Sequence, residues 1–332
     1  MKQTTMLITR KDIEKVFNMK EAIEAVEHVF KLYGENKVQM PPKVYLTFEK
    51  GDLRSMPAYI PELNLAGVKN VNVHPSNKGI PTVMATFTLV DTETGFPLAI
   101  MDATHITNMR TGAAGAIAAK YLSKEDSKTA GFIGTGIQAE TQLQALMITR
   151  PGISKIFVFD ADKNKSMDFA KKAEELYSIN SVIAESIEEV GKNADIIATT
   201  TPVRTPIVKA TDIAEGTHIN AIGADAEGKQ ELESSLIKKA KIVIDNWTQA
   251  SHSGEINVPV SEGVIKREDI YADIGEIASG KKPGRNNPND ITIFDSTGLA
   301  VQDLACAAKI YKIFMEDSTL SKEIQTIDFL SS

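Results

Sequence analysis

Three basic side chains fall on faces that the sequence otherwise makes apolar. In the run LAGVKNVNVH, strand alternation places Lys69 on the same side as Val71. In LRSMPAYI, Arg54 shares its side with Met56, and in the helical run THITNMRTGAAGAIAAKYL, Arg110 lies on the alanine-rich face. A cation among apolar groups is costly unless an anion pairs with it. We therefore expect these three side chains to share a small anion.

These residue types indicate what the anion is and what the lysine can do. An arginine fork binds a carboxylate through two parallel hydrogen bonds. A lysine that is desolvated beside other cations has a lowered pKa and can act as a base or a nucleophile. Each cation taken singly is also explained by snorkelling, in which the stem covers apolar surface. Arg54, Lys69 and Arg110 together favour a carboxylate site.

A carboxylate that could serve the same site ends the apolar run THINAIGAD. This residue, Asp225, falls at the carboxyl end of an expected strand, where ligands of open α/β sheets bind. The alternative is that Asp225 caps a helix that follows the strand, a role that aspartate often takes. The residues alone leave both interpretations open.

The run GFIGTGIQA predicts a dinucleotide site. Gly134, Gly136 and Ala139 form the pattern G-x-G-x-x-A, which permits a tight turn, a close approach of the backbone to a pyrophosphate, and helix-to-strand packing. The N-terminus of the following helix supplies an anion site. Asp160 ends the next strand, IFVFD, close to the expected spacing of roughly 20 residues for a ribose-binding acid. A carboxylate repels a 2′-phosphate, so NAD is predicted rather than NADP.

The elements around these residues follow from periodicity and turn signals. Two helices begin near the start of the chain, where Thr9 with Asp12 and Asn18 with Glu21 have capping-box spacing. The runs KVYLTFE, LRSMPAYI, LAGVKNVNV, TVMATFTLV and PLAIMDA predict an antiparallel meander of about five strands. A long small-residue helix follows, and strands then alternate with helices up to ITIFDS, which predicts a parallel sheet covered on both faces. The helix that starts in GLAVQD is expected to return to the first domain.

Composition limits the classes of partner. The 332 residues carry a net charge of −7, which argues against nucleic acid or an anionic membrane surface as the main partner. Cys306 is the only cysteine, so no intrachain disulfide forms, and its alanine neighbours indicate a small core residue. There is no apolar run of membrane-helix length and no signal peptide, so we expect a cytoplasmic protein. The histidines show no metal-ligand spacing, and no metal is predicted.

Several long runs resemble the ornithine cyclodeaminase and mu-crystallin family over nearly the whole chain. They are MPPKVYLTFEKGDLRSMPAY, LAGVKNVNVHP, GIPTVMATFTLVDTETGFPLAIMDAT, MRTGAAGAIAAKYL, GFIGTGIQA, GTHINAIGADAEGKQEL and ITIFDSTGLAVQD. Within the family, PPKVYLTFEKGDLR, GEINVPVSEGVI and IFDSTGLAVQD most resemble the archaeal-type alanine dehydrogenase branch.

The resemblance implies an α/β fold in which a Rossmann NAD-binding domain, residues 121–299, is inserted into a discontinuous α+β domain. That second domain, residues 1–120 and 300–332, would bind substrate and form a homodimer whose sheets join across the two-fold axis.

The resemblance also assigns roles to individual residues. Arg54 and Lys69 would hold the substrate carboxylate, Arg110 would lie close to substrate and cofactor, and Lys69 and Asp225 would be catalytic. The nucleotide contacts would come from Thr82, Arg110, Gly134, Gly136, Ile137, Gln138, Asp160, Thr200, Ile222, Gly223, Lys229 and Ser296.

The function that this resemblance implies is NAD-dependent oxidative deamination of L-alanine to pyruvate and ammonia, with reductive amination as its reverse. One alternative changes the substrate and gives an ornithine or lysine cyclodeaminase or a ketimine reductase. The other is a mu-crystallin-like NAD(P)H-dependent binding protein without catalysis. The presence of Lys69, Arg110 and Asp225 favours an enzyme.

Overall fold

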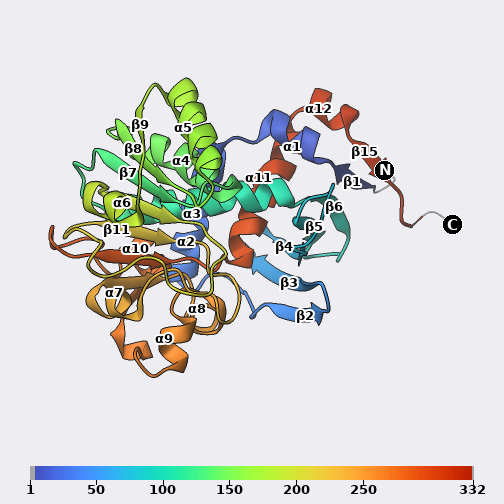
Figure 1. Ribbon diagram of the computed structural model, residues 1–332. Helices are drawn as coiled ribbons and strands as arrows, with labels where there is room; N and C mark the ends of the chain where they lie inside the picture. Colours follow the sequence, from blue (N-terminus) through green and yellow to red (C-terminus); the bar gives the residue numbers. More distant parts are fainter. Residues whose placement is uncertain (1–3, 331–332) are drawn as a thin grey trace. The chain divides into compact units, whose positions relative to one another are not determined.

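The computed structural model describes residues 4–330, which divide into two compact units (Figure 1). Unit 1 runs up to Arg110 and resumes at Leu299, and unit 2 is the intervening segment Thr111–Gly298. The division falls inside helix α3 (Thr104–Leu122), earlier than the predicted boundary at residue 120. The predicted fold class, an α/β Rossmann domain inserted into a discontinuous α+β domain, is confirmed.

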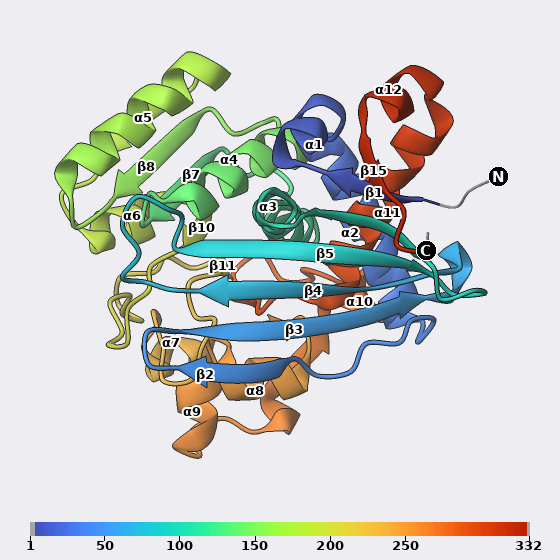
Figure 2. The ribbon, with the colours of Figure 1, turned by 90° about the vertical axis from the view of Figure 1, so that its right-hand side faces the viewer.

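Unit 1 contains a seven-stranded sheet in the order β15-β1-β6-β5-β4-β3-β2. The predicted antiparallel meander is confirmed in β2 to β6, which Figure 2 shows in part as neighbouring strands. The pairing of β1 parallel to β6, and of β15 antiparallel to β1, was not predicted. The strands are β1 (Thr5–Ile8), β2 (Val44–Phe48), β3 (Gly51–Ile60), β4 (Leu65–Val73), β5 (Val83–Asp91), β6 (Pro97–Asp102) and β15 (Gln325–Ile327).

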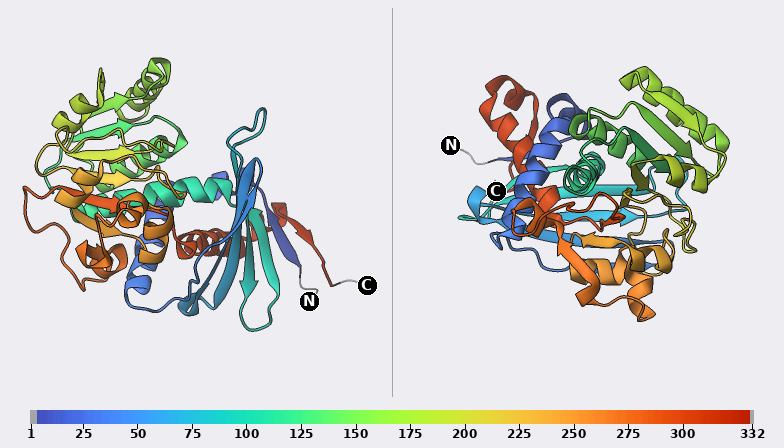
Figure 3. Two further views of the ribbon diagram at one scale, coloured as in Figure 1. Left: turned by 60° about the horizontal axis from the view of Figure 1, so that its bottom comes forward. Right: turned by 90° about the vertical axis from the view of Figure 1, so that its left-hand side faces the viewer.

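Helices cover one face of this sheet. Thr9 and Asn18 cap the first two helices through the predicted capping boxes. The helix from Ala300 packs against β3, β4 and β5 and against α2, as the left-hand view of Figure 3 shows for the sheet. Residues on the inner side of β3, such as Met56 and Ile60, are buried beneath it. The unit 1 helices are α1 (Arg10–Val16), α2 (Met19–Gly34), η1 (Pro61–Leu63), α11 (Ala300–Glu316) and α12 (Ser318–Glu323).

Unit 2 contains an eight-stranded parallel sheet in the order β13-β12-β14-β11-β10-β7-β8-β9. The strand order reverses between β7 and β10, which is where ligands of doubly wound sheets bind. Strand β13 was not predicted, and the run THINAIGAD forms a strand only over its first half, in β11. The strands are β7 (Thr129–Ile133), β8 (Lys155–Phe159), β9 (Asn180–Ile183), β10 (Ile196–Thr199), β11 (His218–Ala221), β12 (Lys241–Ile244), β13 (Ile270–Asp273) and β14 (Thr292–Asp295).

Both faces of the parallel sheet are covered by helices, as predicted. One apolar cluster joins the sheet to the sides of α4 and α5 through residues such as Leu143 and Phe169. A second cluster joins its other face to α6, α7 and α8 through residues such as Val190 and Leu236. The unit 2 helices after α3 are α4 (Ile137–Thr149), α5 (Lys163–Tyr177), α6 (Ile187–Asn193), α7 (Ser234–Lys239), α8 (Trp247–Ser253), α9 (Asn257–Ser261), η2 (Arg267–Asp269) and α10 (Ile274–Ala278).

A buried polar network fixes the unit 2 part of α3 to the parallel sheet. The Asn220 side-chain amide donates to the carbonyl of Gly115 at 3.0 Å, and the Gln142 amide donates to the carbonyl of Thr111 at 2.9 Å. His218 contacts Asn220 through its ring, and burial lowers the pKa of this histidine to about 3, so its ring is neutral. Within residues 4–330, no helix is long and apolar enough to span a bilayer.

Candidate active site

Lys69 lies in the middle of β4 with only 1% of its surface exposed. Its cross-strand neighbours are Met56 on β3 and Phe87 on β5, both buried. Its Nζ atom lies 2.7 Å from a carboxylate oxygen of Asp303 and 3.3 Å from the hydroxyl of Thr107. The predicted inward orientation of Lys69 is confirmed, and its anion is an aspartate of the same unit.

Asp303, on α11, joins two of the three cations. Its carboxylate is completely buried, and its second oxygen accepts a hydrogen bond from Nε of Arg110 at 3.2 Å. The neighbouring Gln302 accepts from Arg110 Nη1 at 3.3 Å and from the backbone N–H of Leu299 at 3.1 Å. Both contacts fix the amide oxygen, and the buried Nε2 of Gln302 has no hydrogen-bond partner among the described residues.

Sequence reasoning missed Asp303 and looked for the carboxylate in Asp225. The signal was present, because Asp303 stands in a helix whose neighbouring positions are alanine, leucine and cysteine. That is the same pattern of a charge on an apolar face that identified Lys69. The run that starts at GLAVQD predicted a helix that returns to the first domain, but the acid within it was not matched to the lysine.

Burial lowers the pKa of Lys69 from its ordinary value to about 7. The carboxylate of Asp303 opposes this effect, and the positive charge of Arg110 adds to it. An ammonium that is surrounded by protein loses its hydration, so the neutral amine gains in relative stability. Near neutral pH, Lys69 can therefore both accept and donate a proton, which is what a general acid or base requires.

Arg54 occupies the same inner face, on β3, with 7% of its surface exposed. Its guanidinium makes a two-pronged ion pair with Asp52, with Nε–Oδ1 at 2.9 Å and Nη2–Oδ2 at 3.0 Å. Tyr45 is the cross-strand neighbour of Arg54 on β2, and the centre of its ring lies 5.7 Å from the guanidinium carbon. The sequence prediction did not foresee Asp52. This pairing fixes the plane of the Arg54 guanidinium near the N-terminal end of β3.

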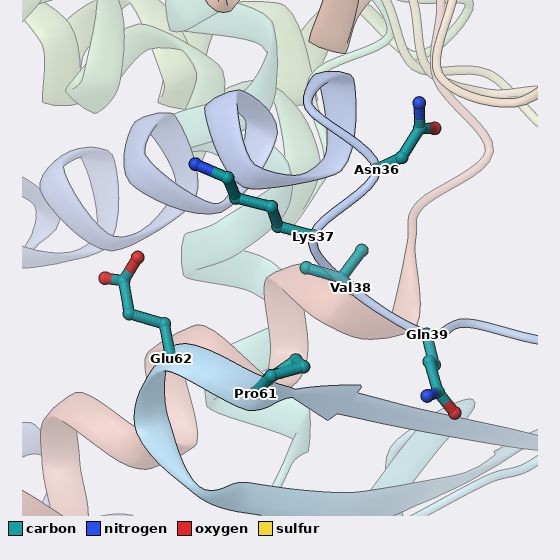
Figure 4. Close-up of a pocket in the computed structure, with 6 residues that line it drawn as sticks. All are labelled: Asn36, Lys37, Val38, Gln39, Pro61 and Glu62. Carbon is teal, nitrogen blue, oxygen red and sulfur yellow. The ribbon is translucent and has the colours of Figure 1, made fainter.

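Two pockets of unit 1 are separate from the cations. One, of about 350 Å³, lies between the segment 36–39 and the turn at Pro61 (Figure 4), and the other, of about 330 Å³, includes Tyr59 and Val68. Both residues alternate away from Lys69, so the second pocket belongs to the opposite face of the sheet. Neither pocket contains Arg54, Lys69 or Arg110.

In unit 2, the turn after β7 has the geometry that the dinucleotide pattern predicts. Gly134 has a φ of +87°, and a Cβ at this position would lie 2.9 Å from the side chain of Thr201. Gly136 is the N-cap of α4 and provides no side-chain cap to the first helical N–H groups. A Cβ at Gly136 would meet no atom within 4 Å, so this helix N-terminus is open to an anion.

Asp160 directly follows β8, as predicted, and is held by three hydrogen bonds. One oxygen accepts from the N–H and hydroxyl of Thr135, at 3.0 and 2.9 Å, and the other accepts from the N–H of Asp162 at 3.0 Å. Burial acts to raise the pKa of Asp160, but the hydrogen bonds from Asp162 and Thr135 outweigh it and lower the pKa. The result is an oriented, ionised acceptor suited to sugar hydroxyls.

Other predicted nucleotide contacts follow the neighbouring strands of the same sheet. Thr200 follows β10 and donates its hydroxyl to the carbonyl of Gly134 at 3.1 Å, while Ile222 and Gly223 follow β11. Ser296 follows β14, and its buried hydroxyl makes no hydrogen bond to any described residue. A buried hydroxyl without a partner is unusual and is typical of a position that a ligand satisfies.

Asp225 lies four positions beyond β11 and forms an ion pair with Lys229 at 2.5 Å. The alternative that it caps a helix is wrong, because the next helix, α7, begins at Ser234 with Glu233 as its N-cap.

The remaining predicted nucleotide contacts lie at the start of α4 and in unit 1. Ile137 is half exposed at the start of α4, next to Gln138, and Thr82 is exposed in unit 1 between β4 and β5. The roles predicted for these residues stay predictions.

The fold and the site define a dinucleotide-binding α/β protein in which a buried aspartate pairs with both a lysine and an arginine. The chain belongs to the ornithine cyclodeaminase/mu-crystallin family, whose model matches residues 3–318.

Three relatives show how close the similarity is. The alanine dehydrogenase of Archaeoglobus fulgidus is 51% identical over 96% of this chain and 97% of its own length. The solved structure of an archaeal alanine dehydrogenase dimer with bound NAD is 50% identical, with a TM-score of 0.93 over 98% of this chain and all of that one. The Thermococcus litoralis Δ1-pyrroline-2-carboxylate reductase, solved with NADH and L-proline, is 39% identical, with a TM-score of 0.91 over 94% of this chain and 98% of that one.

Replacing Asp303 with Asn tests the charge coupling in the cation cluster. Because the Asp303 carboxylate raises the pKa of Lys69 against burial, D303N should move that pKa clearly below 7. NMR titration of the protein labelled in its lysine side chains measures this pKa directly. D52N is the matched control, since Asp52 pairs with Arg54 and should leave the Lys69 titration unchanged. An unchanged Lys69 pKa in D303N would contradict the coupling.

Proposed function

We propose that this protein is an NAD-dependent L-alanine dehydrogenase, which converts L-alanine to pyruvate and ammonia and catalyses the reverse amination. The observation that carries this proposal is the buried Lys69, paired with Asp303 on the same sheet face as Arg54. The similarity to archaeal alanine dehydrogenases, which extends over nearly the whole chain, also supports the proposal. A cytoplasmic location stays a prediction.

The residues of unit 2 fit NAD as the cofactor. The open N-terminus of α4 suits the pyrophosphate, and the oriented carboxylate of Asp160 suits the ribose hydroxyls. The unpaired hydroxyl of Ser296 offers a further donor. The ionised state of Asp160 disfavours the 2′-phosphate of NADP. When bound, NAD supplies the acceptor for the hydride that leaves the substrate Cα.

Lys69 has the features of the proton acceptor. In its neutral form, Nζ takes the proton that the substrate amine loses as its carbon–nitrogen bond becomes an imine. The resulting ammonium of Lys69 is stabilised by the carboxylate of Asp303, 2.7 Å away. Asp225, the second catalytic residue in this proposal, then activates the water that adds to the imine carbon. Loss of ammonia from that adduct leaves the 2-oxo acid.

Arg54 and Arg110 bind and orient the substrate in this scheme. The bidentate pair with Asp52 holds the Arg54 fork in one plane, and a guanidinium in a fixed plane suits a substrate carboxylate. Arg110 is held by Asp303 and Gln302 in the same way, so both forks are oriented before substrate arrives. Orientation before binding reduces the entropic cost of fixing the substrate.

Assembly as a homodimer is the second part of the proposal. Strand β2 is an edge of the seven-stranded sheet and exposes Val44, Leu46 and Phe48, with exposed fractions of 58%, 56% and 44%. Such an edge is prone to pairing with another chain. The archaeal alanine dehydrogenase of similar structure is a dimer. A second copy of the chain that pairs at this edge would remove these apolar side chains from water.

Reduction of a cyclic imine is the second candidate function. It is favoured by the 39% identity to the Thermococcus litoralis Δ1-pyrroline-2-carboxylate reductase. Both reactions need a carboxylate-binding arginine and a group that exchanges a proton with the substrate nitrogen, so Arg54 and Lys69 serve either. A cyclodeaminase would also need an acceptor for a distal ammonium.

A substrate panel tests the proposal. Purified protein with NAD should produce NADH and release ammonia in equal amounts with L-alanine, because both leave the same oxidised carbon. Ornithine and lysine are the comparison substrates, and Δ1-pyrroline-2-carboxylate with NADH tests the second candidate. Cyclic product without net NADH would identify a cyclodeaminase, since that reaction recycles the cofactor. No turnover with any amine or imine would instead support a binding protein.

Lys69→Met tests the base. A thioether cannot accept the proton, so turnover should fall by roughly 10²–10⁴-fold, the usual contribution of general acid–base catalysis. NADH affinity, measured by fluorescence titration, should stay close to that of the unmodified protein. Lys50→Met, in the exposed turn between β2 and β3, is the matched control and should be fully active. Turnover close to that of the unmodified protein, or a loss of activity that is explained by lost NADH affinity, would refute the assignment.

A further inference from the structure

Glu231 is a completely buried carboxylate that joins the ends of two central strands of unit 2. One oxygen accepts from both the N–H and the hydroxyl of Thr201, each at 2.6 Å. The other accepts from the hydroxyl of Thr199 at 2.7 Å and from the N–H of Gly223 at 2.9 Å. Four donors from the ends of β10 and β11 therefore converge on one side chain.

The two strand ends carry residues that the family resemblance assigns to the cofactor. Thr200 lies between the two threonines that Glu231 holds, and Ile222 immediately precedes Gly223. A Cβ at Gly223 would lie 2.2 Å from the carbonyl oxygen of Thr201 and 2.6 Å from the Glu231 carboxylate, so the strand ends meet too closely for any other residue there. The positions of both cofactor-contacting residues thus depend on this carboxylate.

We propose that Glu231 is a positioning residue that holds Thr200 and Ile222 in place for the cofactor. It acts through the loops after β10 and β11 and does not itself touch the reacting atoms. This inference rests on the proposed NAD-dependent function. It concerns the affinity for the cofactor, and it leaves the proton transfer at Lys69 unaffected.

A second buried acid, Glu255, holds the backbone of Glu231. One of its oxygens accepts the N–H groups of Glu231 and Leu232, at 2.9 and 2.6 Å. Its other oxygen has no hydrogen-bond partner among the described residues. Burial and the negative charge of Glu231 raise the pKa of Glu255 well above its ordinary value. Burial also raises the pKa of Glu231, but its four donors favour the ionised form.

The same segment supports another residue of the proposed cofactor site. The side-chain amide of Asn257 donates to the carbonyl of Lys229 at 2.7 Å, and its oxygen accepts the N–H of Gly228 at 2.9 Å. The run GEINVP contributed to the sequence analysis only through its resemblance. In the structure it holds the backbone of residues 228–232 through the side chains of Glu255 and Asn257. Glu231 connects this segment to both strand ends, because its backbone is held by Glu255 and its carboxylate accepts hydrogen bonds from the ends of β10 and β11.

Two isosteric variants test the proposal. In Glu231→Gln, the amide NH2 must face one backbone N–H and one threonine hydroxyl. The hydroxyl can turn and accept, but the backbone N–H loses its acceptor, so at least one buried donor is left unpaired. NADH should bind at least about tenfold more weakly, and the KM for NAD should rise in parallel. The kcat and the KM for L-alanine should stay within about threefold of the unmodified values. Glu255→Gln is the matched control, because its amide oxygen can still accept the N–H groups of Glu231 and Leu232, so this variant should bind NADH normally.

The outcomes separate this inference from the proposed function. A folded E231Q protein with unchanged NADH affinity, or with a loss confined to kcat, would overturn the positioning role. If E231Q does not fold, Thr199→Val removes a single donor and should weaken NADH binding by a few-fold. Unchanged affinity in T199V would then overturn the inference. Failure of the unmodified protein to bind NADH would refute the proposed function, and the inference with it.

Discussion

The buried pair of Lys69 and Asp303 is the interaction on which unit 1 depends. An ammonium and a carboxylate that are both removed from water are costly, and their attraction offsets the cost only when the geometry is good, as it is at 2.7 Å. Removing one partner would leave the other charge unpaired, at a cost of about 3–5 kcal/mol. The pair therefore requires α11 to pack on β4, which explains why the chain returns to its first unit after the parallel sheet is complete.

The same pair gives the lysine its chemistry. Burial moves the pKa of Lys69 down, Asp303 moves it up and Arg110 moves it down again, and the balance lies close to neutral pH. Unit 2 uses the buried acid Glu231 differently, because this carboxylate receives only neutral donors, from Thr199, Thr201 and Gly223. One unit thus uses buried charge to tune a proton acceptor. The other uses it to hold strand ends in place.

Much of this arrangement could be predicted from the sequence, because local patterns encode it. Alternation alone placed Lys69 and Arg54 on the buried face, and G-x-G-x-x-A located the turn before α4. The partner Asp303 was missed, because a pairing across 234 positions leaves no pattern within one element. Asp52 was missed because the predicted strand LRSMPAYI starts at Leu53, whereas β3 begins at Gly51. Strands β1 and β15 were missed for the same reason as Asp303, since each is short and is defined by its pairing with distant residues.

The most direct test of the account is the pH dependence of kcat/KM for L-alanine oxidation by the unmodified protein at saturating NAD. The enzyme–NAD complex needs neutral Lys69 to react with L-alanine, so kcat/KM should rise with pH and bend at an apparent pKa of about 7. The rate constant rises with pH because the proton moves from the substrate to the lysine, which must be neutral to accept it. A profile that is flat between about pH 6 and 8, or that falls as pH increases, would contradict the assignment of Lys69 as the base.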